Sequence, residues 1–593
     1  MPGARGVGLI ADVLRESAQR HRYRPCLRIF SEGRFSGLSY EELDRFVDFF
    51  AAGIIARGIE ARRRICIVSE NRPEWVISYL GSLRAGCTAV PLDSLLKPED
   101  LRYLVRCAQA GMVVSSGKFA KDLEDLRGSG KLGPDIVCFD VRGHVPTTGE
   151  GVEKSDDSED VESSGSFDDL LASGEQALKK GAPCERRVPE HEEAVLIFTS
   201  GTTGVAKGVV LSHRNICFDV TAVLGSVLLR QDDRLLSVLP LHHTLESTAG
   251  LLAPLSRGAS ITYARSLRSK EILADLHACR ATVFISVPLM YEKMATGIKR
   301  GISQSPLEKR LCAGFLLWSA KSIKKTLGVD AGLWFLKSLR KKAGLDCLRI
   351  AISGAAPLRA DVQNFFGILG VPILEGYGLT EASPVVSVNQ VGRLKPGSVG
   401  RPIPGVEVRI ADPDAQGIGE ILVRGDNVMQ GYLESTEATS RVLSQGWLST
   451  GDLGRLDEEG YLYICGRSKN VIVTQAGKKI FPEEVEAALA KSPFVSEVMV
   501  VGAKNSTSGR EEVHALIYPD FEQLQLYAEE NHIRLDEELI KEIIRSEIRK
   551  LCAVLSDYKR VKNFTIRGEE FPKTSSKKIK RQVLSADETP AEG

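Results

Sequence analysis

A loop rich in hydroxyls and glycines follows an apolar run near position 200. The segment from Ile197 to Gly208 reads IFTSGTTGVAKG. Small residues let backbone N–H groups approach a phosphate chain, hydroxyls donate to its oxygens, and a lysine adds positive charge. This pattern predicts a phosphate-binding loop, with candidate residues Thr199, Ser200, Gly201, Thr202, Thr203, Gly204 and Lys207.

The loop differs from the pattern of P-loop nucleotide hydrolases. In the pattern G-x-x-x-x-G-K-[ST], a glycine directly precedes the lysine and a hydroxyl follows it. Here Gly204 stands three residues before Lys207, and Gly208 follows that lysine. The sequence therefore does not imply P-loop chemistry, and a flexible surface loop is the alternative interpretation.

A second group of chemically competent residues lies in the segment EGYGLTE, residues 375–381. Tyr377, between two glycines, can present its ring face to a flat base, and Thr380 can donate to a phosphate. Glu381 supplies a hard oxygen ligand for Mg²⁺. Because an unpaired glutamate in apolar surroundings is costly, we expect a metal ion or a basic partner beside Glu381.

Two further segments contain residues that could bind the ribose or the base of a nucleoside. Asp452 ends the string QGWLSTGD and can accept hydrogen bonds from both ribose hydroxyls, while Arg467 can donate to ribose or phosphate. A surface salt bridge between these two residues is the alternative. The string SGAAP at 353–357 leaves room for a base against the backbone, although alone it indicates only a strand-to-helix turn.

Histidines and lysines complete the set of candidates. His242 and His243 follow the apolar run at 238–241 and could line a pocket or cap a loop. The tail segment FPKTSSKKIKR, residues 571–581, concentrates lysines, for which a plain basic tail is the alternative.

Together these segments resemble the adenylate-forming superfamily of acyl-CoA synthetases, luciferases and peptide-synthetase adenylation domains, over nearly all of the chain. The resemblance implies an adenine-binding wall at Gly354, Ala355 and Ala356, and a gate of the acyl pocket at His243. It also implies that Asp452 and Arg467 contact ribose and phosphate, and that Tyr377 contacts adenine.

The same resemblance assigns roles in the C-terminal part. Lys469 matches a hinge about which a small domain swings, and the loop around Gly477 then reaches the site. Within the family pattern P-K-T-x-S-G-K-I-x-R, Lys578 aligns with the lysine that holds the carboxylate and the α-phosphate. Lys577 departs from the pattern, because it stands where the family has a glycine, which can supply backbone angles that lysine resists.

The implied function is ATP-dependent activation of a fatty acid as an acyl-adenylate, followed by transfer to the thiol of coenzyme A. ATP, coenzyme A and Mg²⁺ are therefore expected, with Thr199 and Glu381 as the metal ligands. The strings PLHHTLE at 240–246 and EASPVVS at 381–387, with an insertion at 300–346, look most like long-chain fatty acyl-CoA synthetases.

Other functions stay open at this point. A fatty acyl-AMP ligase or an acyl carrier protein synthetase would stop at the adenylate or redirect it. A catalytically inactive lipid-binding or scaffold protein is suggested only by Lys577. A luciferase-like oxygenase has support from the fold alone.

The elements that must position these residues alternate between strands and helices. Apolar runs at 65–68 and 88–91 flank a segment of helical spacing at 75–83, and similar runs recur at 194–198, 282–287 and 348–352. This pattern predicts an α/β fold with a large N-terminal domain of doubly wound, mostly parallel sheets. We expect this domain at 1–467 and a small, mobile α+β lid domain at 468–593.

Two insertions are expected in the N-terminal domain. The stretch at 147–189 is polar and acidic, so we expect a mobile surface insertion there. The stretch at 300–346 mixes basic and apolar residues. It could be a helical pair packed on the body with solvated lysines, or an amphipathic surface that meets membranes or lipid.

Bulk composition excludes several classes of partner. With 593 residues and a formal net charge of +1, the chain needs more than one domain and has no bulk attraction for nucleic acid or an anionic membrane. Its 12 cysteines include no C-x-x-C pair, which favours a reducing compartment. Without a signal peptide or an apolar run long enough to span a bilayer, we expect a cytoplasmic protein with at most peripheral membrane contact.

Overall fold

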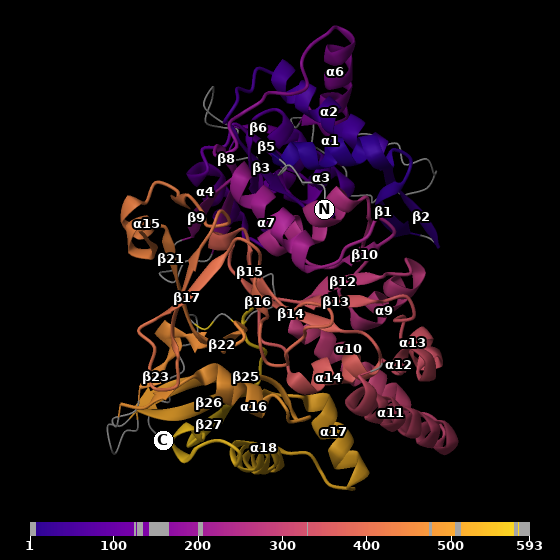
Figure 1. Ribbon diagram of the computed structural model, residues 1–593, viewed down its shortest axis with the longest axis vertical. Coiled ribbons are helices and arrows are strands. Elements are labelled where there is room, and N and C mark those ends of the chain that lie inside the picture. The colour runs from indigo at the N-terminus through magenta and orange to yellow at the C-terminus, as the bar shows by residue number, and fades with distance from the viewer. Residues whose placement is uncertain are drawn as a thin grey trace. The chain divides into compact units, whose positions relative to one another are not determined.

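The computed structural model divides the chain into two compact units (Figure 1), each described here by itself. The first unit comprises Met1–Glu407 and Val423–Leu448, and the second comprises Val408–Leu422 and Ser449–Gly593. The structure describes residues 8–31, 33–123, 126, 134–140, 165–199, 206–328, 330–473, 477–504, 511–573, 579 and 581.

One sheet of the first unit carries the predicted phosphate-binding segment. Its strands from β8 to β7 run parallel to their neighbours, whereas β9 pairs antiparallel with both β8 and β19. In spatial order, the described strands are β19 (Gly431–Tyr432), β9 (Lys207–Ser212), β8 (Glu193–Thr199), β4 (Thr88–Pro91), β3 (Arg64–Val68), β5 (Met112–Ser115), β6 (Asp135–Cys138) and β7 (Gly165–Ser166).

A second sheet of the same unit carries the predicted adenine-binding segments. Its central strands are parallel, and antiparallel pairs lie at both edges. The described strands are, in order, β16 (Arg401–Pro402), β15 (Val385–Val388), β14 (Ile373–Gly378), β13 (Ile350–Ser353), β12 (Val283–Ser286), β10 (Arg234–Ser237), β11 (Ser260–Tyr263), β1 (Pro25–Ser31) and β2 (Arg34–Ser39).

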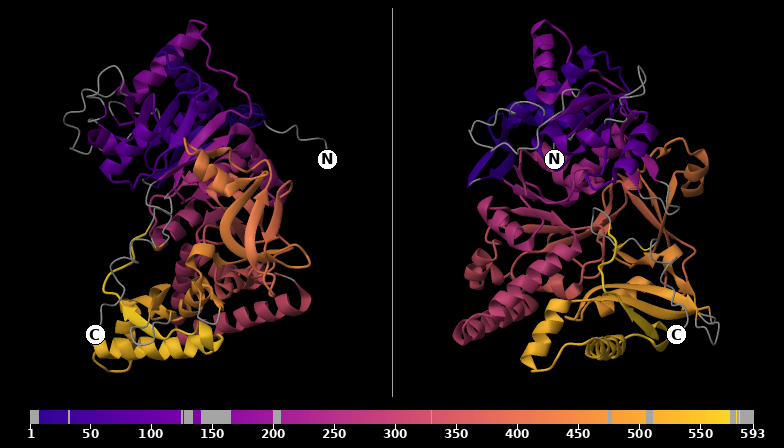
Figure 2. Two further views of the ribbon diagram at one scale, coloured as in Figure 1. Left: turned by 90° about the vertical axis from the view of Figure 1, so that its left-hand side faces the viewer. Right: turned by 180° about the vertical axis from the view of Figure 1, so that it is seen from behind.

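Helices cover these sheets, as the two further views in Figure 2 also show. The described helices of the first unit include α1 (Ile10–His21), α2 (Tyr40–Ala56), α3 (Pro73–Arg84), α4 (Pro98–Cys107), α5 (Ala120–Leu123), α6 (Phe167–Lys179), α7 (His213–Ser226), α8 (Ala253–Arg257), α9 (Ser269–Ala278), α10 (Pro288–Ser303), α11 (Leu307–Leu327), α12 (Gly332–Phe335), α13 (Lys337–Lys342), α14 (Ala360–Ile368) and α15 (Thr436–Val442). The predicted α/β class with mostly parallel sheets is confirmed.

The sequence signals of this fold have clear physical causes. Helix α3 starts with Pro73, which suits the first helical position because its missing N–H is not needed there. It ends with Arg84 in its last turn, where a positive charge interacts favourably with the helix dipole. Strands β3 and β4 are buried throughout apart from the first residue of β3, so both read as uninterrupted apolar runs. The predicted strand, helix, strand unit at 65–91 is therefore confirmed.

The expectation of a mobile insertion over 147–189 is wrong for its second half. Residues 147–164 lie outside the described part of the chain, but β7 joins the sheet and α6 packs along α2. Ser166 caps the N-terminus of α6, and Phe167, Leu170 and Leu171 are buried at helical spacing. The acidic residues before position 161 obscured this short apolar stripe.

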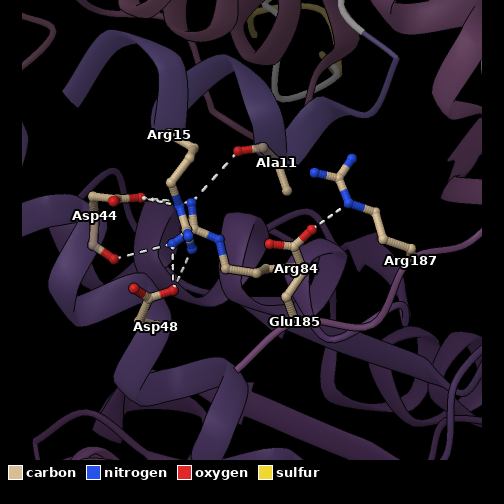
Figure 3. Close-up of polar contacts among 7 residues, drawn as sticks. All are labelled: Ala11, Arg15, Asp44, Asp48, Arg84, Glu185 and Arg187. Carbon is tan, nitrogen blue, oxygen red and sulfur yellow. Dashed lines mark hydrogen bonds and ion pairs between the residues drawn. The ribbon is translucent and has the colours of Figure 1, made fainter. Parts of the chain in front are cut away.

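A cluster of charges around the buried Arg84 ties α1, α2 and α3 together (Figure 3). The Arg84 side chain is 1% exposed, and its guanidinium donates to Asp44 at 2.6 Å and to Asp48 at 2.9 Å. Arg15 also donates to Asp48, at 2.6 Å. The Asp44 and Asp48 side chains are 17% and 22% exposed, so loss of Arg84 would leave two partly buried carboxylates with Arg15 as their remaining cation.

We expect Arg84→Met to lower the free energy of unfolding by about 3–5 kcal/mol, because Asp44 and Asp48 lose their buried donor. The measurement is urea denaturation followed by circular dichroism. The matched control is Arg20→Met, which removes an exposed ion pair with Glu16 on the same helix as Arg15. That control should change stability by no more than about 0.5 kcal/mol. Equal effects of the two substitutions would contradict the assigned importance of the cluster.

The second unit has its own small sheets and core. Strand β20 (Leu443–Ser444) still belongs to the first unit. The described strands that lie wholly or partly in the second unit are β17 (Glu407–Ala411), β18 (Gly419–Arg424), β21 (Trp447–Leu456), β22 (Leu462–Arg467), β23 (Ile472–Val473), β24 (Lys479–Ile480), β25 (Val495–Lys504), β26 (Glu511–Pro519) and β27 (Asn563–Ile566). Its helices include α16 (Pro482–Leu489), α17 (Phe521–Glu530) and α18 (Glu537–Cys552). Val485, Val500, Val513 and Ile544 belong to one buried cluster between β25, β26, α16 and α18.

The unit boundary and the predicted domain boundary fall at different places. Packing divides the chain after Leu448, and residues 408–422 pack with the second unit. The predicted boundary after Arg467 concerns the position of a hinge and stays a prediction.

Within the described residues, no helix combines sufficient length with sufficient apolar character to cross a membrane.

Candidate functional site

The predicted phosphate-binding loop connects the ends of two paired strands. Thr199 ends β8, Lys207 begins β9, and the two residues are direct partners in the antiparallel register. The Thr199 hydroxyl donates to the Lys207 carbonyl at 3.4 Å. The strand ends thus place a hydroxyl and an ammonium group at the base of the loop. Ser200, Gly201, Thr202, Thr203 and Gly204 lie outside the described residues.

Lys207 and Glu381 meet at one tyrosine. Glu381 lies in the short 3₁₀ helix η4 (Thr380–Ala382), which follows β14. The hydroxyl of Tyr432 donates to Glu381 Oε1 at 2.9 Å, and Lys207 Nζ lies 4.8 Å from the centroid of the Tyr432 ring. Two candidates from distant parts of the sequence are therefore brought together. Tyr432 was not among the residues predicted from the sequence, because its local signal is no more than a Gly-Tyr pair on the short strand β19.

The turn that carries Glu381 is held by three buried polar side chains. Asn427 Nδ2 donates to two backbone carbonyls within 382–385, at 3.1 and 3.0 Å. Thr248 donates to a third carbonyl at 3.3 Å, and Asp219 accepts from a backbone N–H at 3.4 Å. A Cβ on Gly378 would lie 1.8 Å from a backbone oxygen of the neighbouring residue 384, so only glycine fits there. The position of Glu381 is therefore fixed before any substrate binds.

The residues around this turn fit a hard cation such as Mg²⁺. A carboxylate and a hydroxyl, from Glu381 and Thr199, are oxygen ligands of the kind Mg²⁺ prefers. Within the described part of the chain, no group of three or more His, Cys, Asp and Glu side chains could enclose a metal ion.

The predicted adenine wall presents small side chains at the end of β13. Gly354 is buried, whereas Ala355 and Ala356 are exposed, and Ala355 has a φ of +74°. A Cβ on Gly354 would lie 3.1 Å from the Leu245 side chain, so the wall adjoins the segment that follows the two histidines. Tyr377 is half-buried on the neighbouring strand β14.

A buried carboxyl group lies behind this wall. Glu375, at the centre of β14, accepts a hydrogen bond from the backbone N–H of Leu358 at 2.9 Å. Burial raises the pKa of Glu375 to about 7. Glu375 had no predicted role, because residue type alone does not distinguish a buried glutamate from an exposed one.

The two histidines occupy different environments. His242 is buried, with Nε2 3.6 Å from Asp93 Oδ1, and burial lowers the pKa of His242 against the opposing effect of Asp93. His243 is half-buried, and its ring centroid lies 4.3 Å from that of His242. His243 is thus the more accessible of the two, as a residue that gates a pocket must be.

A π-helical segment, η3 (Glu246–Leu252), begins directly after these histidines, and its first residue is a fully buried carboxyl group. Glu246 accepts a hydrogen bond from the Ser237 hydroxyl at 2.6 Å. Burial raises the pKa of Glu246 to about 8, against the smaller opposing effect of Ser237. The folded protein therefore keeps this group protonated at neutral pH.

This burial predicts a pH-dependent stability. An unfolded chain ionises Glu246 near the ordinary pKa of 4.5, whereas the folded protein does so near 8, so stability falls as pH rises between these values. We expect the difference in unfolding free energy between Glu246→Gln and wild type to shift in favour of the variant by about 3 kcal/mol from pH 5 to pH 8. Urea denaturation at both pH values measures it. The exposed Glu407→Gln serves as the control, and a pH-independent difference for Glu246→Gln would contradict the assignment.

In the second unit, Asp452 and Arg467 form a defined pair. They are register partners on β21 and β22, and Arg467 Nε lies 2.8 Å from Asp452 Oδ1. The carboxylate is 8% exposed and the arginine 49%. The ion pair named as an alternative in the sequence analysis is thus present, and it fixes the orientation of a carboxylate that could also accept from a ribose.

The predicted hinge and the predicted coenzyme A-side loop follow along the same unit. Lys469 is an exposed residue of the short 3₁₀ helix η5 (Ser468–Asn470), and partial desolvation and then the nearby Arg467 lower the pKa of Lys469. Gly477 lies in the connection between β23 and β24, with a φ of +72° that favours glycine. Their hinge and loop roles stay predictions.

The basic tail is anchored on both sides of its central segment. Before it, Lys573 forms an ion pair with Glu497, whose carboxylate also accepts from the Phe571 N–H at 3.1 Å. After it, Arg581 forms an ion pair with the half-buried Glu486. Lys577 and Lys578 lie outside the described residues.

Comparison with known proteins finds matches over most of the chain. The family model described as "AMP-binding enzyme" matches residues 14–433, and the model described as "AMP-binding enzyme C-terminal domain" matches residues 484–578. The chain is 29% identical to the long-chain-fatty-acid–CoA ligase FadD15 of Mycobacterium bovis, over 93% of this chain and 91% of that protein. It is 28% identical to the long-chain-fatty-acid–CoA ligase of Bacillus subtilis, over 98% and 94%.

Solved structures agree with the fold. The crystal structure of ATP-bound MatB from Rhodopseudomonas palustris superimposes with a TM-score of 0.72 at 25% identity, over 97% of this chain and 98% of that one.

Proposed function

Because the chain belongs to the AMP-binding enzyme family, we propose that it is an ATP-dependent long-chain fatty acid–CoA ligase. It activates the fatty acid as an acyl-adenylate, releases pyrophosphate, and passes the acyl group to the thiol of coenzyme A. The observation that carries this proposal is the similarity to ligases of that name over 93% and 98% of this chain.

The chemistry explains why ATP is required. A carboxylate acylates poorly because its oxide is a bad leaving group, whereas a mixed anhydride with AMP has a good one. Forming that anhydride brings two anions together at the α-phosphorus. The protein must therefore supply positive charge and hydrogen-bond donors to the reacting groups.

In this proposal the first unit binds the triphosphate and the magnesium ion. The phosphate-binding groups are Thr199, Ser200, Gly201, Thr202, Thr203, Gly204, Lys207 and Thr380. Thr199 and Glu381 hold Mg²⁺, which when bound offsets the charge of the phosphates. The short contacts of Tyr432 with both Glu381 and Lys207 support a common site for metal and phosphate.

The nucleoside and the acyl chain take neighbouring places. Adenine lies against Gly354, Ala355, Ala356 and the ring of Tyr377, and His243 gates the acyl pocket. The proximity of Gly354 to Leu245 supports this, because it links the nucleotide wall to the segment that carries His243. Asp452 and Arg467 bind the ribose.

The second unit provides the residues that change between the two half-reactions. Lys578 holds the carboxylate and the α-phosphate during adenylation. A swing about Lys469, which would separate a domain at 1–467 from a lid at 468–593, then withdraws it and brings the loop around Gly477 to the site for thiol attack. We also propose a cytoplasmic location, on the sequence arguments given above.

The decisive experiment is an acid panel from acetate to oleate, with AMP release and acyl-CoA measured in the presence and absence of free coenzyme A. The proposal expects the highest kcat/KM for long chains and acyl-CoA as the product. Adenylate without acyl-CoA would indicate an acyl-AMP ligase or a carrier-protein synthetase instead. Absence of fatty-acid-dependent pyrophosphate exchange into ATP would indicate an inactive lipid-binding protein.

A further inference from the structure

A single side-chain amide holds the backbone of the loop that carries His243. We call this loop, residues 238–245 between β10 and η3, the gate loop. Asn71 lies between β3 and α3, and its Nδ2 donates to the Leu239 carbonyl at 2.7 Å. Its Oδ1 accepts from the Leu241 N–H at 2.9 Å. The amide thus bonds a carbonyl and an N–H two residues apart, as a residue of a parallel strand would.

These bonds reach the turn that sets the position of His243. The His243 N–H donates to the Pro240 carbonyl at 3.1 Å and closes this turn. The His243 carbonyl then accepts from the N–H groups of Glu246 and Ser247, both at 3.0 Å, where the next helical segment starts. Because Leu241 lies inside the turn, any shift of its N–H is passed to His243, two residues later.

The contacts of Asn71 continue to both ends of the gate loop. Asn71 Nδ2 also donates to Ser237 Oγ at 3.4 Å, at the end of β10, and the Ser237 hydroxyl donates to Glu246 Oε1 at 2.6 Å. Ser237 and Glu246 are 4% and 1% exposed, so their hydrogen bond lies in a low-dielectric interior, where it is stronger than in water. Three side chains therefore connect the end of the strand, the middle of the loop and the start of η3.

The anchor itself belongs to a rigid part of the first unit. Asn71 follows β3, of which all but the first residue is buried, and precedes α3, which is buried throughout. The neighbouring Arg72 donates twice to Glu74 at the start of α3, both times at 2.9 Å. Strand β3 lies in the sheet with the predicted phosphate-binding segment, and β10 lies in the other sheet. Asn71 therefore joins the two sheets at the gate loop.

We propose that Asn71 is a positioning residue for His243, and that it thereby controls how well the acyl pocket accepts a fatty acid. The inference rests on the proposed function, in which His243 gates that pocket. Asn71 acts through the backbone of the gate loop and not through contact with the substrate. A side chain that holds another in its productive position affects the rate without touching the reacting groups.

Steady-state kinetics of the full-length protein test this role, with acids from octanoate to oleate and with ATP. Asn71→Ala should raise the KM for the fatty acid and lower kcat/KM by about 10- to 100-fold, because small misplacements of a contacting group have effects of this size. The KM for ATP should stay close to that of wild type. Asn71→Asp keeps the acceptor for Leu241 but sets a carboxylate oxygen against the Leu239 carbonyl, so it should lose as much.

A double-mutant cycle with His243→Ala separates positioning from stability. If Asn71 acts through His243, Asn71→Ala should lower kcat/KM by no more than about 2-fold once His243 is already alanine. Asn389→Ala is the matched control, because the Asn389 amide also bonds a carbonyl and an N–H, of Ser398 at 2.6 Å and of Lys395 at 3.1 Å. Its effect should be the same with and without His243.

Equal effects of Asn71→Ala in the wild-type and His243→Ala backgrounds would overturn the inference and leave Asn71 as a structural bond. A loss that appears equally in the KM for ATP would do the same. Wild-type protein that forms no acyl-CoA from any acid would refute the ligase proposal and this inference together, whereas an active wild type with independent effects refutes this inference alone. Circular dichroism checks the folding of each variant, and Asn71→Asp serves where Asn71→Ala does not fold.

Discussion

Replacing Lys578 with alanine should slow acyl-adenylate formation by about 100- to 1000-fold, because the transition state loses the cation that neutralises the carboxylate and the α-phosphate. Thioester formation from supplied acyl-adenylate and coenzyme A should change far less, since the lysine is proposed to leave the site before that step. Fatty-acid-dependent exchange of pyrophosphate into ATP measures the first half-reaction. Acyl-CoA formation from the supplied adenylate measures the second.

The neighbouring lysine is the matched control for this experiment. Lys577→Ala removes the same charge one residue earlier in the chain, at the position where the family pattern has glycine. We expect that variant to retain pyrophosphate exchange within a few-fold of wild type. A larger loss for Lys577→Ala than for Lys578→Ala would move the catalytic assignment by one residue. Equal and small losses would contradict a catalytic tail lysine.

Replacing Glu381 with glutamine should lower kcat by about 100-fold and raise the Mg²⁺ concentration needed for half-maximal rate, because a neutral amide is a poor ligand for a hard cation. Tyr432→Phe keeps the carboxylate but removes the hydrogen bond of 2.9 Å that orients it. That variant should lose about 10-fold in apparent metal affinity, as the removal of an outer-shell partner usually does. Initial rates at varied Mg²⁺ concentration separate the two effects.

An exposed glutamate provides the comparison for Glu381. Glu437→Gln removes a carboxylate that is 78% exposed and pairs only with a neighbouring arginine of α15 in the described structure. It should leave the Mg²⁺ dependence unchanged. If Glu381→Gln also left the Mg²⁺ dependence unchanged, Glu381 would not be a metal ligand, and Tyr432 would have a purely structural role.

The sequence predicted those parts of the fold whose signals are local. Strands β3, β4 and β8 are buried on both faces, so their apolar runs are readable without a structure. Helix α6 was missed because its buried residues Phe167, Leu170 and Leu171 follow a long acidic stretch. Composition averaged over that stretch outweighed a short helical pattern.

The site could be predicted only as separate pieces. Each motif names its own residues, but the contact between Tyr432 and Glu381 joins positions 51 residues apart, and the bonds from Asn427 to the same turn span 42 and 45 residues. Long-range pairs of this kind depend on strand order, which a single sequence does not encode visibly. The ion pair between Asp452 and Arg467 could be named as an alternative from the sequence, because the two residues are close in the chain and lie on one hairpin.

The anchoring of the tail has a practical consequence for how its lysine can be studied. Deleting the chain after residue 572 would remove Lys578 but also Arg581, the cation paired with the half-buried Glu486. Loss of that cation leaves a half-buried carboxylate unpaired, so a truncated protein would lose stability as well as the lysine. Loss of function in such a deletion would say nothing about chemistry, whereas a point substitution isolates it.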